Sequence, residues 1–360
     1  MITEQRKITT EPRKIKYVEA LREALDYCLA SDKRVFVIGE GVPDPKAIFG
    51  TTTGLLEKYG KNRVLDMPLS ENGLTGVCIG AALTGLRPVL IHQRIDFSLL
   101  ALDQVINNAA KWHYMFGGKN SVPLVIRMVI GMGWGQGAQH SQNLQALYAH
   151  IPGLKVVMPT TAYDAKGLLI SSIQDNNPII FIEHRWLHNL LDYVPEEPFT
   201  VPLGEGKIRR EGNDCTLVAT SYMVVEANKA ADFLKNKGIG VEVIDLRTLK
   251  PLDENIIRTS IKKTGRLLAV DSGYYTGGFA GEIISRIAEK EFLSLRCAPE
   301  RITLPDHPAP SSPGLAQYYY PRAKHIVEKI AVMMSRPDII FEEDASLPLD
   351  VPDNSFTGPF

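Results

Sequence analysis

Short apolar runs alternate with helical patterns along the chain, and this alternation restricts the fold more than any other feature of the sequence. The segment RVFVIGEG at residues 34–41 is an example, because it is an apolar run that ends in Gly-x-Gly. Such a run indicates a buried parallel strand whose carboxyl end opens into a loop. Strands that alternate with helices favour an α/β domain with a parallel sheet. In the first half we expect strands at 34–41, 64–66, 88–91, 123–129, 154–159 and 178–183, and helices at 17–30, 72–85, 100–112, 141–148 and 162–173.

A second α/β pattern follows a segment rich in proline. Residues 185–212 contain Pro195, Pro198 and Pro202 and show little periodicity, which is typical of a linker. A chain of 360 residues is also too long for one ordinary core. After this segment we expect strands at 215–221, 240–246 and 266–271, and helices at 224–237, 278–289 and 321–334. We therefore predict an N-terminal arm at 1–14, a first domain at 15–190, a linker at 191–212, a second domain at 213–335 and an acidic, proline-rich surface tail at 336–360.

Composition and short motifs exclude several classes of protein. The net charge of −1 gives no general attraction to nucleic acid or to an anionic membrane, and we expect neither as a partner. None of the 4 cysteines forms a CxxC pair, the N-terminus lacks the apolar run of a secretory signal, and no stretch approaches the ~20 apolar residues of a membrane span. These features predict a reduced, cytoplasmic protein. The sequence also lacks GxxxxGK[ST], GxSxG and HExxH, which disfavours P-loop NTPases, α/β-hydrolases and zincins.

A glycine-spaced helix begins directly after an acidic residue. In PLSENGLTGVCIGAALTG, at residues 68–85, Glu71 lies where a loop enters the helix, and small residues let that helix pack closely against another backbone. One interpretation of Glu71 is a functional carboxylate. The other is a capping acid that follows Ser70 at a helix start. The motif alone favours the capping acid.

Two further segments follow the ends of expected strands, where α/β folds place ligands. Phe97 lies in the first, HQRIDFSLLALDQ, and its ring could stack on a flat heterocycle or simply anchor the next helix in the core. His140 lies in the second, GAQHSQ. It could donate or accept a proton near neutral pH, or it could be a histidine at a helix start that bonds the backbone.

Six phrases, in this order, resemble the beta subunits of pyruvate and branched-chain 2-oxoacid dehydrogenases, which are thiamine-diphosphate enzymes of the transketolase-like superfamily. The resemblance covers the chain from Ile15 to Met334. It implies two doubly wound α/β domains: one that binds the aminopyrimidine of the cofactor, and one like the C-terminal domain of transketolase. The phrases are SENGLTG, FSLLALDQVINNAAK, AQHSQ, HIPGLKVVMPTTAYDAKGLL, DNNPIIFIEH and VIDLRTLKPLD.

The resemblance assigns a role to each candidate residue. Glu71 would hydrogen-bond N1′ of the aminopyrimidine, and this favours the imino tautomer that removes the proton at C2 of the thiazolium. The cofactor then serves as the electron sink for decarboxylation. Phe97 would stack on the aminopyrimidine, and His140 would lie near the substrate. A monovalent cation, potassium, would be held by backbone carbonyls of Leu124, Ser172, Ile173, Asp175 and Asn177.

One missing motif indicates a partner. Enzymes of this class hold Mg²⁺ and the diphosphate with a GDG motif and a later Asn, and this sequence contains no GDG. The resemblance therefore implies an alpha subunit that carries GDG, an active site between subunits and an α2β2 heterotetramer. The implied reaction is decarboxylation of a small 2-oxoacid, with transfer of the acyl or aldehyde unit to an acceptor, usually the lipoyl arm of an acyltransferase.

The sequence departs from the family pattern beside Phe97. Gln93 and Arg94 stand where the family has an aromatic and small residues, and we expect both to line the substrate pocket. Arg94 could meet an anionic group of the substrate or point to solvent. Two other functions remain open: the C-terminal half of a split transketolase or a stand-alone carboligase, and a subunit that only completes a scaffold. The intact Glu71 argues against the scaffold, and the phrases DNNPIIFIEH and AQHSQ favour the dehydrogenase.

Overall fold

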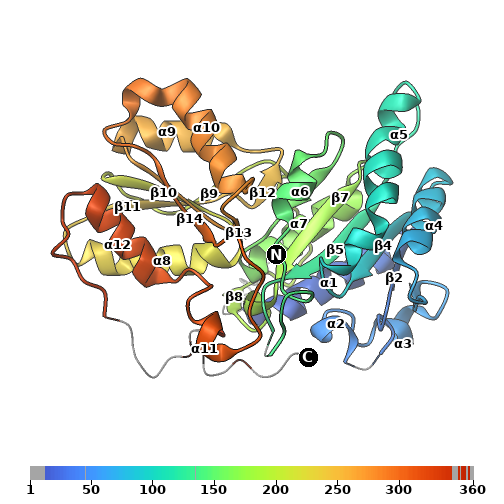
Figure 1. Ribbon diagram of the computed structural model, residues 1–360. Helices are drawn as coiled ribbons and strands as arrows, with labels where there is room; N and C mark the ends of the chain where they lie inside the picture. Colours follow the sequence, from blue (N-terminus) through green and yellow to red (C-terminus); the bar gives the residue numbers. More distant parts are fainter. Residues whose placement is uncertain are drawn as a thin grey trace, which may run out of the picture.

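A seven-stranded sheet forms the centre of the first domain (Figure 1). The structure is a computed structural model that describes residues 13–44, 46–133, 135–342, 348, 350–353 and 356. Of the predicted N-terminal arm, residues 1–12 lie outside this range. In spatial order the strands are β12 (Thr248–Lys250), β6 (Lys155–Val157), β7 (Ile179–His184), β5 (Val125–Ile130), β4 (Arg87–His92), β2 (Val35–Gly39) and β3 (Val64–Leu65). All pairs except β12 with β6 are parallel.

Helices cover both faces of this sheet, because alternate residues of each strand point to opposite faces. Val89 and Ile91 pack in one apolar cluster with α1 and α7, whereas Leu90 packs in a second cluster with α4. The helical elements are α1 (Tyr17–Ser31), α2 (Ala47–Gly50), α3 (Leu55–Tyr59), α4 (Glu71–Leu83), a 3₁₀ turn (Phe97–Ala101), a π-helical turn (Gln104–Ala109), α5 (Ala110–Met115), α6 (Gln145–His150), α7 (Ala162–Gln174) and a 3₁₀ turn (Arg185–Leu187).

The second domain is built on a five-stranded sheet. Its strands, in spatial order, are β14 (Glu300–Leu304), β13 (Leu267–Tyr274), β10 (Cys215–Ala219), β11 (Val241–Asp245) and the antiparallel edge strand β9 (Lys207–Arg210). Leu217 faces α8 and α12, and Val218 faces α9 and α10, so both faces are again covered. The helices are α8 (Tyr222–Lys235), α9 (Glu254–Thr264), α10 (Phe279–Glu291), a 3₁₀ turn (Phe292–Ser294), α11 (Pro313–Ala316) and α12 (Ala323–Met333). The predicted pair of doubly wound α/β domains is confirmed.

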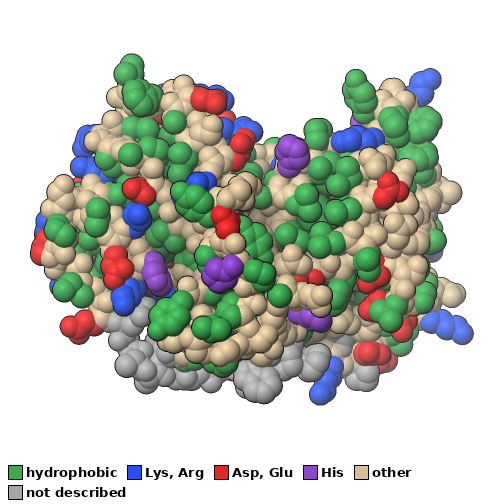
Figure 2. Space-filling view, viewed as in Figure 1, with side chains coloured by type: hydrophobic (Ala, Val, Ile, Leu, Met, Phe, Trp, Pro, Cys, Tyr) green, Lys and Arg blue, Asp and Glu red, His purple; other side chains and the backbone are tan. Residues whose placement is uncertain are grey.

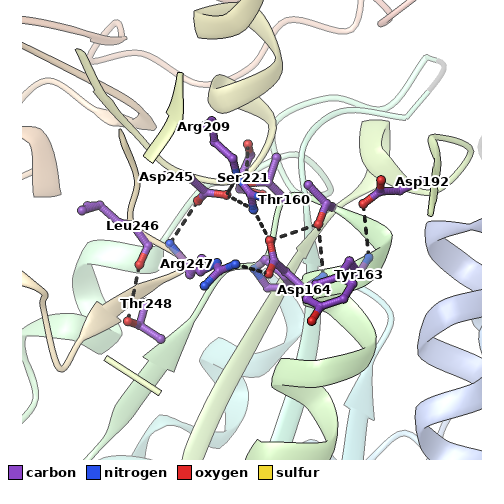
Figure 3. Close-up of polar contacts among 12 residues, drawn as sticks. Thr160, Tyr163, Asp164, Asp192, Arg209, Ser221, Asp245, Leu246, Arg247 and Thr248 are labelled. Atoms are coloured by element: carbon purple, nitrogen blue, oxygen red, sulfur yellow. Dashed lines mark hydrogen bonds and ion pairs between the residues drawn. The ribbon is translucent and has the colours of Figure 1, made fainter. Parts of the chain in front are cut away.

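The two domains share a strand and a network of buried ion pairs. Strand β12 follows β11 in the chain but pairs with β6 at the edge of the first sheet. Beside it, Asp164 of α7 lies between Arg209 and Arg247, and Arg209 also binds Asp245 (Figure 3). Asp164 and Asp245 are fully buried, so each carboxylate depends on these guanidinium groups for charge compensation.

Several elements differ from the sequence prediction. The expected helix at 100–112 is divided into a 3₁₀ turn, a π-helical turn and α5, and the expected helix at 141–148 begins only at Gln145. The predicted linker 191–212 contains β8 (Leu191–Tyr193), which pairs with β1 (Lys14–Lys16), and the strand β9.

The described part of the tail also differs from a surface arm. The buried Arg322 donates hydrogen bonds to the carbonyls of Val351 and Pro352, at 3.3 and 3.2 Å, and Val351 is itself buried. A buried guanidinium needs acceptors, and the tail supplies two of them.

The surface shows no strong charge separation in the view of Figure 2. Acidic and basic side chains are interspersed over the visible face, and a notch separates the two domains where α6 faces α10. No helix in the described part of the chain has the length and apolar character needed to cross a bilayer. The interspersed charges agree with the near-zero net charge of the sequence.

Candidate active site

A cavity of about 500 Å³ lies beyond the carboxyl ends of β2, β4 and β5, and four of the site residues predicted from the sequence line it. They are Gln93, Arg94, Phe97 and His140. A larger cavity of about 690 Å³ lies on the second domain between β14 and α12, and none of the predicted site residues line it. The smaller cavity is the candidate active site, because parallel sheets bind ligands at the carboxyl ends of their strands.

Phe97 and His140 meet inside this cavity. Their ring centroids are 5.3 Å apart and the planes are nearly perpendicular, at 88°. Phe97 is half-buried and His140 is exposed, so a ligand can reach both rings. His140 is not at the start of a helix, because α6 begins five residues later at Gln145. One aromatic face and one imidazole therefore lie side by side, as a flat heterocycle and a reacting group beside it would require.

Arg94 is buried instead of pointing to solvent. Its side chain is 2% exposed, and its Nη1 donates to the carbonyl of Gly131 at 2.5 Å. Its Nη2 donates to Oε1 of Gln136, which also accepts from the backbone N–H of Gly133 at 3.0 Å. Burial lowers the pKa of Arg94 to about 10, and the nearby Arg185 adds to this effect. The guanidinium is thus fixed at the cavity wall.

Glu71 is the first residue of α4 and is 8% exposed. Ser70, just before it, makes no capping hydrogen bond through its side chain. The cavity wall does not include Glu71, but a short path connects them: Gln93 donates to the carbonyl of Glu40 at 3.2 Å, and Glu40 lies near Glu71. Burial raises the pKa of the Glu40 carboxyl, and the charges of Glu71 and Asp66 raise it further. Oε1 of Glu40 is buried without a partner among the described residues.

The sequence did not indicate the loop after β2 as part of the site. Gly41, Asp44, Lys46, Ile48 and Phe49 line the cavity together with Gln136. Ile48 and Phe49 both have positive φ values, 39° and 58°, which are rare for such residues and often occur at functional sites. The signal in the sequence was the GEG that ends the strand. Gly41 has φ +67°, and a Cβ there would meet the side chains of Asp44 and Gln93 at 3.2 and 3.4 Å.

Two of the five predicted cation ligands bind an arginine instead. The guanidinium of Arg87 donates to the carbonyls of Ile173 at 2.8 Å and Asp175 at 2.5 Å. The carbonyl of Leu124 accepts from the backbone N–H of Ile179 at 2.9 Å. The oxygens of Ile173 and Asp175 therefore converge on one positive group.

Comparisons with known proteins agree with this architecture. Residues 13–189 match the pyrimidine binding domain of transketolase, and residues 204–326 match the transketolase C-terminal domain. The beta subunit of an acetoin:2,6-dichlorophenolindophenol oxidoreductase of Bacillus subtilis is 42% identical over 90% of this chain and 98% of its own length. The chain belongs to the family of beta subunits of heteromeric, thiamine-diphosphate-dependent 2-oxoacid dehydrogenases.

Other members of this beta-subunit family are equally similar. The beta subunit of the pyruvate dehydrogenase E1 component of Rickettsia felis is 41% identical over 87% of this chain and 96% of its own length. A solved structure titled a split-gene transketolase, an inactive beta4 tetramer, has a TM-score of 0.74 and covers 91% of this chain and 100% of its own. It is 21% identical, so it shows the shared fold alone.

Proposed function

We propose that this chain, with an alpha subunit, forms an α2β2 enzyme that decarboxylates a small 2-oxoacid and transfers the acyl unit to a lipoyl acceptor. The observation that supports it best is the meeting of Phe97 and His140 in a cavity that Gln93 and Glu40 connect to the buried Glu71. Thiamine diphosphate, when bound, supplies the carbanion and the electron sink that the decarboxylation needs. Other subunits of the family pair with an alpha chain.

The residues fit the aminopyrimidine end of the cofactor. Phe97 offers an accessible ring face for stacking. Glu71 offers a carboxylate to hold a proton at the ring nitrogen N1′, and the unpartnered Oε1 of Glu40 lies in the same acidic cluster. His140 is placed to donate or accept a proton at the substrate. The diphosphate and Mg²⁺ are assigned to the alpha chain, because this sequence contains no GDG.

The experiment that tests this division is calorimetry on the separate and combined chains. The single chain should bind thiamine diphosphate weakly or not at all, whereas the complex with a GDG-containing alpha chain should bind it with Mg²⁺. Micromolar binding by the single chain would overturn the split site. Reductive acylation of an isolated lipoyl domain, compared with release of a free aldehyde or carboligation product, would test the acceptor.

The four free cysteines agree with a proposed location in the cytoplasm.

We also propose a potassium ion at the backbone carbonyls of Leu124, Ser172, Ile173, Asp175 and Asn177. The support is the family resemblance, which assigns these carbonyls to the ion; in this structure the carbonyls of Ile173 and Asp175 accept hydrogen bonds from Arg87. A carbonyl oxygen has a second lone pair, so a bond to Arg87 leaves room for a cation. If potassium binds, the thermal midpoint should be higher in potassium chloride than in choline chloride at equal ionic strength. Equal midpoints would mean that no potassium ion binds at these carbonyls.

A further inference from the structure

Two buried arginines lie beside the candidate active site. Arg94 is 2% exposed and Arg185 is 4% exposed. Within the described residues, neither guanidinium forms an ion pair with a carboxylate, although Asp96 lies close enough to favour the charged form of Arg94. Burial lowers the pKa of both to about 10, so both remain cationic at neutral pH. A buried charge without a paired counter-charge is costly, which makes this region strongly attractive to an anion.

An alternating stack holds the two arginines in place. The guanidinium carbon of Arg94 lies 5.6 Å from the ring centre of Phe49, and that of Arg185 lies 4.8 Å from the same ring. Arg185 also lies 4.9 Å from the ring of Phe356 in the tail. The stack runs from the cavity wall to the tail. It fixes two positive charges by contacts with aromatic rings, which form no ion pair with either arginine.

Arg94 is oriented before any ligand arrives. Its two bonds, to Gly131 and Gln136, use two of the five N–H groups of a guanidinium. Gln136 is held in turn by the backbone N–H of Gly133. A pre-oriented guanidinium binds carboxylates and phosphates well, because little side-chain entropy is lost on binding.

The reacting carboxylate of a 2-oxoacid is a poor match for such a group. That carboxylate loses its charge as CO₂ departs, so a fixed cation beside it would stabilise the ground state more than the transition state. A cation instead helps when it binds a part of the substrate whose charge does not change. The binding energy then serves orientation at the reacting carbon.

We propose that the cavity selects a 2-oxoacid that carries a second anionic group, a carboxylate or a phosphate, and that Arg94 binds this group. The inference rests on the proposed function and names its substrate class. Gln136 is a positioning residue, because it acts through Arg94. Lys46 and Asp44, both exposed, also line this cavity, so they add no net charge to it.

The test uses the reconstituted α2β2 complex and a matched pair of acids. 2-Oxoglutarate and 5-methyl-2-oxohexanoate are nearly isosteric and differ in the charge at the far end. The wild-type complex should prefer the anionic acid in kcat/KM by roughly 10- to 100-fold, the range of a charged hydrogen bond. A 2-oxoacid with a terminal phosphate forms the third arm and separates the two kinds of anion. Arg94→Gln should bring the preference close to one, mainly through KM, and Arg94→Lys should restore part of it.

Matched variants separate the possible outcomes. Arg34→Gln, at an exposed arginine paired with Asp32, should leave the preference unchanged. Gln136→Leu keeps the charge of Arg94 and removes its orienting partner, so it should lower the preference even if Arg94→Gln fails to fold. Calorimetry with glutarate, which does not react, should show binding that Arg94→Gln loses.

One outcome would overturn the inference and leave the proposed function intact. In that outcome the complex turns over 2-oxoacids that have no second anionic group, and neither Arg94→Gln nor Gln136→Leu changes the kcat/KM ratio between the two acids. Failure to exchange the cofactor C2 proton or to turn over any 2-oxoacid would instead refute the proposed function. Loss of glutarate binding in Arg94→Gln would still support the anion site in that case.

Discussion

The imidazole of His140 meets the ring of Phe97 edge to face, with centroids 5.3 Å apart. The two residues come from loops after different strands, and one ring is accessible for stacking while the other can reach a substrate beside it. In the function proposed above, the two residues have separate tasks in a single cavity: Phe97 holds the heterocycle and His140 moves a proton. Variants at these positions should affect different steps.

His140→Ala should impair the steps that follow cofactor activation. We expect turnover to fall roughly 100- to 10,000-fold, the range for loss of a positioned acid or base. Exchange of the cofactor C2 proton should stay near normal, because the proposed function assigns His140 to the substrate and Glu71 to cofactor activation. Both rates should be measured on the same reconstituted complex. His150→Ala, at an exposed histidine of α6, is the matched control. A parallel loss of exchange in His140→Ala would contradict this division of tasks.

Glu71→Gln should slow the exchange itself. The substitution keeps size but removes the negative charge that holds a proton at N1′, so exchange and turnover should both fall roughly 100- to 10,000-fold. Glu57→Gln, at an exposed acid in the first turn of α3, should change neither rate. If exchange in Glu71→Gln is near normal and only stability falls, by about 0.3–1 kcal/mol, Glu71 is a capping acid.

Acid should destabilise the fold well before the carboxylates titrate. Burial lowers the pKa of His92 to about 4, of His184 to about 3 and of His188 to about 4. As the pH falls below about 6.5, these histidines bind protons in the unfolded chain but stay neutral in the folded chain. Stability is therefore lost from pH 6.5 down to about pH 4 for His92 and His188, and to about pH 3 for His184. Each histidine contributes a slope of up to about 1.4 kcal/mol per pH unit.

Urea denaturation at pH 7.5, 6 and 5 measures this dependence. His92→Asn should reduce the slope by about one proton, because it removes one of the three groups. A free energy of unfolding that stays constant between pH 6.5 and 5 would rule out neutral, buried histidines.

Asp164→Asn should weaken the junction of the two domains. It removes a fully buried charge that pairs with Arg247 at 2.7 Å and also with Arg209, and it leaves these guanidinium groups partly uncompensated. The expected cost is about 3–5 kcal/mol in the free energy of unfolding. Asp232→Asn breaks an exposed pair with Arg210 and should cost at most about 1 kcal/mol. Equal small effects of the two variants would show that the buried network does not hold the domains together.

Much of the fold could be predicted because its signals are local. The helix expected at 17–30 is observed at Tyr17–Ser31, and the one expected at 162–173 is observed at Ala162–Gln174, since the helical spacing of apolar residues is visible within each segment itself. The buried strands were equally clear from their apolar runs. By contrast, Thr248–Lys250 joins the first sheet from the second half of the chain, and no local pattern indicates which sheet a short strand will extend.

The sequence by itself therefore determined the two α/β domains, the family resemblance and the candidates Phe97, His140, Gln93 and Arg94, which the cavity brings together. Only the tertiary structure decided the state of Arg94. Its acceptors, Gly131 and Gln136, lie about forty residues away in the chain, and Phe49 approaches it from α2. Charge and residue type can be read from the sequence, but burial and pairing depend on which distant segments the packed sheets bring together, so the environment of a charge is a property of the fold.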